Sequence, residues 1–91
     1  MSPEQIGAVK QVGPPSDVFT LGAVLAYAAT GHGPFDAPYP AVLAKVLNDP
    51  PALDGISGPL LRVIAACLRK NPDDRPPLQD ILARLTAVEA L

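Results

Sequence analysis

The stretch Ser16–Gly31 reads SDVFTLGAVLAYAATG, and it decides what kind of fold this chain can adopt. From Val18 to Thr30 it is apolar on every face of a helix. We expect Ser16 to cap the start of this helix and Gly31 to end it. A helix that is apolar all round in a water-exposed chain lies at the centre of a fold, where other helices cover it.

Proline and glycine divide the rest of the chain into further helices, and we find no strand-like alternation of useful length. The sequence predicts a helix that starts at Ser2-Pro3 and is short, because Gly7 and Gly13 bracket a weakly periodic stretch. After the central helix it predicts helices at residues 39–47, 58–70 and 78–88. Arg69 and Lys70 suit the C-terminal dipole of helix 58–70. The residues expected to face inward from the last helix are Leu78, Ile81, Leu82, Leu85 and Val88. The predicted fold is all-α, with four or five helices.

Length and composition exclude several classes of protein. Ninety-one residues make one small domain, and a net charge of −2 with a pI near 5.0 makes nucleic acid a poor partner. The single cysteine, Cys67, cannot form an internal disulfide and fits a buried position in the cytoplasm. The longest apolar run, Val18–Ala29, is shorter than the roughly 20 residues that cross a bilayer, so we expect no membrane segment in this chain.

Groupings of residues that could perform catalysis are missing from the sequence. His32 stands in a Gly-Pro loop without a cysteine or second histidine to form a metal site. Gly31–Gly33 is a turn and not a phosphate-binding loop, because no strand precedes it. The carboxylates Asp73 and Asp74 adjoin Arg75, and by themselves they indicate a solvated turn. The sequence therefore predicts no catalytic, cofactor-binding or metal-binding residue in this chain.

Four short segments carry a more specific signal through their order and spacing. They are Ser2–Gln5 (SPEQ), Ser16–Gly22 (SDVFTLG), Thr30–Phe35 (TGHGPF) and Cys67–Pro76 (CLRKNPDDRP). Together they resemble the C-terminal part of a protein Ser/Thr kinase domain, from the end of the activation segment to the last helix. The glutamine after Glu4 and the many Ala and Leu residues are similar to bacterial kinases of the eukaryotic-like type.

The resemblance implies roles for individual residues. Glu4 and Arg75 would form a buried ion pair that links the end of the activation segment to the loop before the last helix. Asp17 would anchor the backbone of the catalytic loop in the parent kinase. Helix 39–47 matches a segment that often docks substrates or partners, with the candidate docking residues Tyr39, Val42, Leu43 and Val46. The same apolar pattern could equally be ordinary core packing.

The resemblance also implies a function for the parent protein, which would transfer the γ-phosphate of Mg-ATP to protein Ser or Thr. By resemblance the N-lobe, the catalytic loop and the metal-binding motif lie N-terminal to Ser2. We therefore expect residues 1–91 to be a truncated kinase domain that uses no cofactor itself, while ATP and Mg serve the parent. Its partners would be the rest of the kinase domain and a protein substrate. The alternatives are a non-catalytic kinase-like interaction or dimerisation module and an unrelated helical bundle that matches by chance.

Self-association is expected of the isolated chain. The helix Val18–Ala29 is apolar on all faces, and few residues are left to cover it. A second copy could supply the cover, either by packing against this face or by exchanging a terminal helix. The Gly- and Pro-rich links Gly7–Pro15 and Asn48–Pro59 are candidate hinges for such an exchange.

Overall fold

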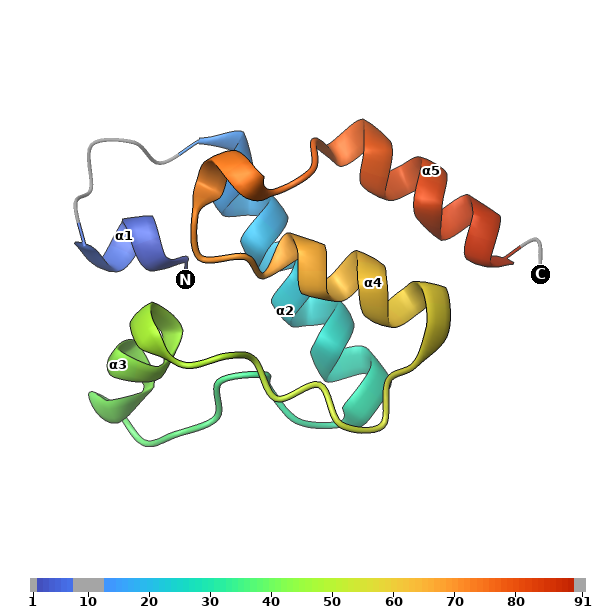
Figure 1. Cartoon of the computed structure of the whole chain (residues 1–91). Coiled ribbons are helices and arrows are strands. Elements are labelled where there is room, and N and C mark those ends of the chain that lie inside the picture. Colours follow the sequence, from blue (N-terminus) through green and yellow to red (C-terminus); the bar gives the residue numbers. More distant parts are fainter. Residues whose placement is uncertain (1, 8–12, 90–91) are drawn as a thin grey trace.

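The computed structural model describes residues 2–7 and 13–89, and all regular secondary structure in these ranges is helical. The described residues form five α-helices and one short 3₁₀ helix, arranged as in Figure 1. In chain order they are α1 (Pro3–Gly7), α2 (Pro14–Thr30), α3 (Ala41–Asn48), α4 (Gly58–Cys67), η1 (Pro72–Asp74) and α5 (Leu78–Glu89). The prediction of an all-α fold with four or five helices is confirmed. None of these described helices is long and apolar enough to cross a membrane.

Helix α2 lies in the middle of the molecule, with α4 packed across it and α5 packed against α4 (Figure 1). Two clusters of buried side chains meet at the α2–α4 contact. The larger cluster contains Phe19, Ala26, Phe35, Val46, Ile56, Ile64 and Leu68. The smaller cluster contains Val18, Val63, Cys67 and Ile81. Because α2 and α4 contribute to both clusters, they form the core on which α1, α3 and α5 are placed.

Helix α2 is central but only partly covered, in line with the expectation that few residues are left to cover it. Its buried residues are Ser16, Val18, Phe19, Gly22 and Ala26. On another side Val24 and Tyr27 are 58% and 61% exposed. The reason is geometric, since α4 is the principal helix packed on α2 and covers only one part of its circumference.

Helix boundaries differ from the prediction by two or three residues at three places, one of which is the start of α3 at Ala41 instead of Tyr39. Helix α2 begins at Pro14 with Gly13 as its N-cap, so Ser16 is not the cap but lies inside the first turn. Proline at the first helical positions explains the earlier start, because its fixed φ is already helical. Helix α4 ends at Cys67 and not at Lys70. The carbonyl oxygens of Arg69 and Lys70 instead accept hydrogen bonds from Arg75, which holds these residues in a turn.

Helix α5 buries fewer of its apolar residues than its pattern predicts. Ile81 is fully buried and Leu85 half-buried, but Leu78 and Leu82 are 52% and 54% exposed. The prediction that Leu78 and Leu82 face inward is therefore wrong. Helix α5 packs mainly on α4, so one narrow stripe is covered. The side chain of Val88, predicted to face inward, lies outside the described part of the chain, as do residues 8–12 of the Gly7–Pro15 link.

Gly22 allows the close approach of α2 and α4. A Cβ atom added at this position would lie 2.6 Å from the Cβ of Cys67 and 3.2 Å from Cδ2 of Leu68. The Cβ of Cys67 is attached directly to the α4 backbone and cannot swing away. A glycine inside a helix costs about 1 kcal/mol relative to alanine, and this contact is the reason that the cost is accepted here.

Candidate functional site: the Glu4–Arg75 cluster and its pocket

Short local motifs present the two residues of the predicted ion pair. Glu4 stands in the first turn of α1, where Gln5 Oε1 accepts hydrogen bonds from Ser2 N (2.7 Å) and Ser2 Oγ (3.0 Å). Arg75 follows η1, whose start is capped by Asn71 Oδ1 through a hydrogen bond from Asp73 N (3.0 Å). These motifs fix the two chain segments from which the charged side chains extend toward each other.

The structure brings Glu4 and Arg75 together in a two-pronged ion pair. Arg75 Nη1 lies 2.6 Å from Glu4 Oε2, and Nη2 lies 2.9 Å from Glu4 Oε1. The Arg75 side chain is fully buried, and the Glu4 side chain is 10% exposed. Ser16 Oγ donates a further hydrogen bond of 2.6 Å to Glu4 Oε2. We call these three residues the Glu4–Ser16–Arg75 cluster.

Every N–H donor of the Arg75 guanidinium has a partner. Besides the two hydrogen bonds to Glu4, Nη1 donates to Pro15 O (2.9 Å), Nε to Arg69 O (2.7 Å) and Nη2 to Lys70 O (3.1 Å). An arginine offers five donors in a fixed fork, so its capacity is completely used. The guanidinium carbon also lies 4.8 Å from the ring centroid of Phe19. Arg75 thereby joins α1, the start of α2 and the turn after α4.

The Glu4 carboxylate is held in its charged form by this environment. Burial by itself would raise its pKa, but the hydrogen bonds from Arg75 and Ser16 outweigh that effect. The pKa of Glu4 consequently falls from 4.5 to about 2. Because both charges are paired and hydrogen-bonded, the cluster stabilises the fold only while both partners are present.

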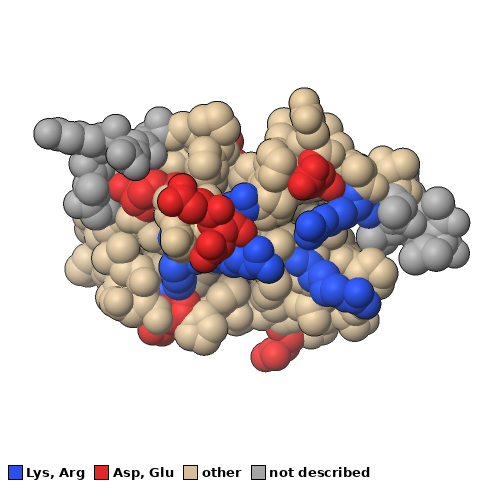
Figure 2. Space-filling view, turned by 45° about the horizontal axis from the view of Figure 1, so that its top comes forward, with Lys and Arg blue, Asp and Glu red and all other residues tan. Residues whose placement is uncertain are grey.

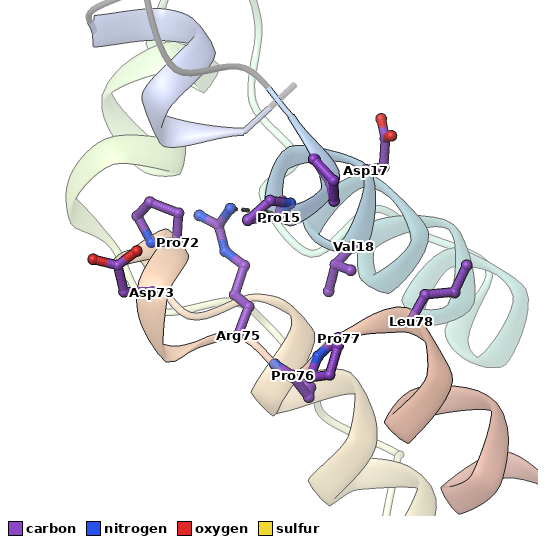
Figure 3. A pocket seen from close by; sticks show the side chains of 10 residues that line it. Pro15, Asp17, Val18, Pro72, Asp73, Arg75, Pro76, Pro77 and Leu78 are labelled. Carbon is purple, nitrogen blue, oxygen red and sulfur yellow. Dashed lines mark hydrogen bonds between the residues drawn. The ribbon is translucent and has the colours of Figure 1, made fainter.

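A pocket of about 380 Å³ opens beside Arg75, between the start of α2 and the segment from η1 to the start of α5 (Figure 3). Its lining is Pro14, Pro15, Asp17, Val18, Pro72, Asp73, Arg75, Pro76, Pro77 and Leu78. Prolines and aliphatic side chains make most of this surface, and two exposed carboxylates, Asp17 and Asp73, stand at it. Figure 3 shows the Asp17 carboxylate pointing away from Arg75, so it is free of the cluster and open to solvent. The pocket suits a peptide segment with apolar side chains and hydrogen-bond donors.

The four candidate docking residues do not share one open face. Tyr39 precedes α3 and is 80% exposed, whereas Val46 is 6% exposed and belongs to the larger core cluster. Val42 and Leu43 are half-buried between these extremes. The large exposed apolar residues around α3 are Tyr39 and Leu47, and Leu47 belongs to the same apolar pattern as the four candidates.

The sequence did not predict the long-range hydrogen bonds of two residues, Ser16 and Lys70. Ser16 was assigned to helix capping, and its bond to Glu4 joins residues twelve positions apart, which no local pattern indicates. Lys70 was assigned to the dipole of its own helix, yet its ammonium group bonds the end of α3. Figure 2 shows acidic and basic side chains next to one another, without a continuous field of one sign on the face in view. Within residues 2–7 and 13–89 there is no group of three His, Cys, Asp or Glu residues placed to hold a metal ion.

Comparison with known proteins identifies the relatives of this chain. It is 46% identical over 87 residues to the probable serine/threonine-protein kinase PkwA of Thermomonospora curvata, a match that covers 94% of this chain and 12% of that protein. It is 38% identical over 86 residues to the serine/threonine-protein kinase AfsK of Streptomyces coelicolor, covering 93% of this chain and 11% of that protein. Mitogen-activated protein kinase kinase 3 of Arabidopsis thaliana is 34% identical over 88 residues, covering 91% of this chain and 17% of that protein.

No protein-family model matches the chain. The chain spans about an eighth of the length of the bacterial kinases that it matches. The matches nevertheless cover nearly all of this chain. This chain is therefore a homologue of the C-terminal helical part of a Ser/Thr protein kinase domain.

Proposed function

We propose that this chain forms the helical base of the C-terminal lobe of a Ser/Thr protein kinase. The whole kinase would transfer the γ-phosphate of Mg-ATP to Ser or Thr residues of a protein substrate. The observation that supports this proposal best is the Glu4–Ser16–Arg75 cluster, which joins three kinase-like motifs in one fully hydrogen-bonded arrangement. ATP and Mg would bind to the rest of the kinase domain, and no residue of this chain is assigned to them.

In this role the chain supports the active site from beneath. Asp17 lies in the first turn of α2, is exposed, and stands at the 380 Å³ pocket. Its carboxylate would accept hydrogen bonds from backbone N–H groups of the catalytic loop, and the apolar lining of the pocket would receive that loop's side chains. The natural partners would be the remaining kinase domain and a protein substrate. The free, buried Cys67 fits a cytoplasmic location.

A segment exchange tests the proposal. The 87 matched residues of the Thermomonospora curvata kinase are replaced by this chain, and transfer of radiolabelled phosphate to a generic protein substrate is measured. We expect an active hybrid enzyme, because the pair of charges and the hydrogen bonds that hold the cluster are contained within the exchanged segment. A hybrid that folds and binds ATP but transfers no phosphate would refute the assignment.

The role of Asp17 is tested in the same hybrid. Replacing Asp17 by Asn should lower kcat by about ten-fold or more, because a misplaced catalytic loop loses the geometry that the transfer needs. Asp73→Asn is the matched control, since Asp73 is an exposed carboxylate at the same pocket. Equal kcat values for the two variants would remove Asp17 from the proposed anchoring role.

Exposed apolar residues favour a second candidate, a non-catalytic interaction or dimerisation module. Val24 and Tyr27 of α2 are both more than half exposed, although they belong to the most apolar helix of the chain. In a kinase such residues would be covered by other segments of the domain. In a module they would be covered by a second copy or another protein. The segment exchange separates the two, because only the first candidate predicts an active hybrid enzyme.

A further inference from the structure

Lys70 closes the end of a helix that is distant from it in sequence. Its Nζ donates a hydrogen bond of 2.6 Å to Val46 O and makes a longer contact of 3.4 Å with Lys45 O. Both carbonyls belong to the last turn of α3, where carbonyl oxygens run out of helical N–H partners; Lys45 O still accepts a hydrogen bond of 2.9 Å from Asp49 N. Lys70 supplies a donor to Val46 O and places a positive charge at the negative end of the helix dipole.

A line of stacked groups connects Lys70 with the Glu4–Ser16–Arg75 cluster. Lys70 Nζ lies 4.2 Å from the ring centroid of Phe35, and the rings of Phe35 and Phe19 stack at 5.9 Å with an interplanar angle of 12°. The Arg75 guanidinium lies over the Phe19 ring in turn. Lys70 and Arg75 are also joined directly, because Arg75 Nη2 donates to Lys70 O. The end of α3 is therefore linked to the ion pair through both side chains and backbone.

Few other contacts hold α3 in place. It has eight residues, too few for an isolated helix to be stable in water, and it reaches the core through the buried Val46 and the partly buried Val42. The helix against which it packs is the short α1. Lys45 makes a second polar tie, from its Nζ to Asp36 O (3.1 Å), but this bond is exposed to solvent and therefore weak. The position of α3 consequently depends heavily on Lys70.

The surroundings of Lys70 favour this role. Burial lowers its pKa, while the charge of Asp49 acts in the opposite direction and favours the ammonium form. The Lys70 ammonium group has lost part of its hydration shell and contacts two carbonyl oxygens and the Phe35 ring in place of water. Such charge-assisted hydrogen bonds are about twice as strong as neutral ones.

We propose that Lys70 is a positioning residue, which fixes α3 relative to the Glu4–Ser16–Arg75 cluster and so orients the face of α3 that meets the protein substrate. The part of this statement that concerns substrate rests on the proposed kinase function. The exposed apolar residues Tyr39 and Leu47, at the two ends of α3, would form part of that face.

Hydrogen exchange on the 91-residue chain tests the positioning itself. In K70M the backbone amides of residues 43–48 should exchange about ten-fold faster than in the parent, because loss of a hydrogen bond to a charged group shifts an equilibrium by that order. K70R, which can still donate to both carbonyls, should restore protection. K45M is the matched control, because it removes the exposed bond on the same helix and should change exchange little. Unchanged protection of residues 43–48 in a folded K70M would overturn the proposal.

A second variant keeps the test usable if K70M does not fold. K70Q retains a hydrogen-bond donor without the charge. The amides of residues 43–48 should exchange faster in K70Q than in the parent, but by less than the roughly ten-fold expected for K70M. Protection in K70Q equal to that of K70R would show that the charge is not needed, contrary to the proposal. Exchange of α4 amides, which K70Q should leave unchanged, reports whether the core is intact.

Kinetics of the hybrid kinase test the link to substrate. K70M should raise KM for the protein substrate several-fold and leave KM for ATP and kcat unchanged, and K70R should restore the lower KM. Faster exchange of α3 without any change in KM for the protein would refute the substrate role and leave the positioning role standing. An inactive hybrid would instead refute the proposed function, while hydrogen exchange on the 91-residue chain would still decide the positioning.

Discussion

Replacing Glu4 by Gln should destabilise the fold by about 3–5 kcal/mol at pH 7, because it leaves the buried Arg75 charge without its partner. The pKa of Glu4 gives an independent magnitude. A fall from 4.5 to about 2 corresponds to roughly 3 kcal/mol, at about 1.4 kcal/mol for each pKa unit. A chain of this length has a total stability of about 5–14 kcal/mol, so E4Q should lose about a fifth of it or more.

Urea denaturation followed by circular dichroism measures this loss, and its pH dependence gives a second check. The pKa of Glu4 is lower in the folded than in the unfolded state, so its contribution is complete above pH 4.5 and is lost as the pH falls toward 2. The difference in unfolding free energy between the parent and E4Q should therefore be largest near neutral pH. It should shrink through this window and nearly vanish at its lower end.

Asp54→Asn is the control, because Asp54 is an exposed turn residue and its replacement should change stability by no more than about 0.5 kcal/mol. The double variant E4L/R75M, which removes both charges together, should recover part of the stability that E4Q loses. The reasoning fails if E4Q lies within 1 kcal/mol of the parent at pH 7. It also fails if the difference is the same at pH 3 as at pH 7.

Three further predictions concern the chain as a whole. G22A should cost about 1–3 kcal/mol in urea denaturation, because its Cβ would overlap that of Cys67; a neutral or stabilising result would contradict the close packing of α2 on α4. The purified 91-residue chain should neither bind ATP nor transfer radiolabelled phosphate, and measurable transfer would refute the assignment of ATP to the rest of the kinase domain. The same chain should self-associate through exposed apolar residues such as Val24 and Tyr27, and light scattering that gives 9.4 kDa at all concentrations up to tens of micromolar would exclude this.

The helices could be predicted from the sequence because their signals are local. Proline, glycine and apolar spacing act within a few residues, and they locate all five α-helices to within a few positions. The pairing of Glu4 with Arg75 is different, because 71 positions separate the two residues. No rule of spacing joins residues so far apart, and the pair could be foreseen only from the resemblance to a kinase. Charge pairing and hydrogen bonding explain why the Glu4–Arg75 pair is stable, but they do not identify the two partners from the sequence.

Exposure could not be predicted because periodicity shows which residues share a stripe, not whether anything covers that stripe. Leu78 and Leu82 have the spacing of inward-facing residues, yet α5 packs mainly on α4, and this contact buries Ile81 while leaving Leu78 and Leu82 exposed. On α2 an uncovered apolar face was expected from the small number of residues left to cover it, but the pattern did not show that Val24 and Tyr27 would lie on that face. In each case the apolar pattern is a property of the helix, whereas burial is a property of the assembly around it.

Lys70 shows how a correct physical rule can be applied to the wrong helix. A cation near the end of a predicted helix favours that helix's own dipole, and on this ground Lys70 was assigned to α4. The structure ends α4 three residues earlier, at Cys67, because Arg75 takes the carbonyls of Arg69 and Lys70 for its own hydrogen bonds. Lys70 is thereby turned toward the carbonyls that end α3, 24 positions away. Lys70 still places its positive charge at the C-terminal end of a helix. That helix is α3 and not α4, because the arginine of the Glu4–Arg75 ion pair holds the turn that follows α4.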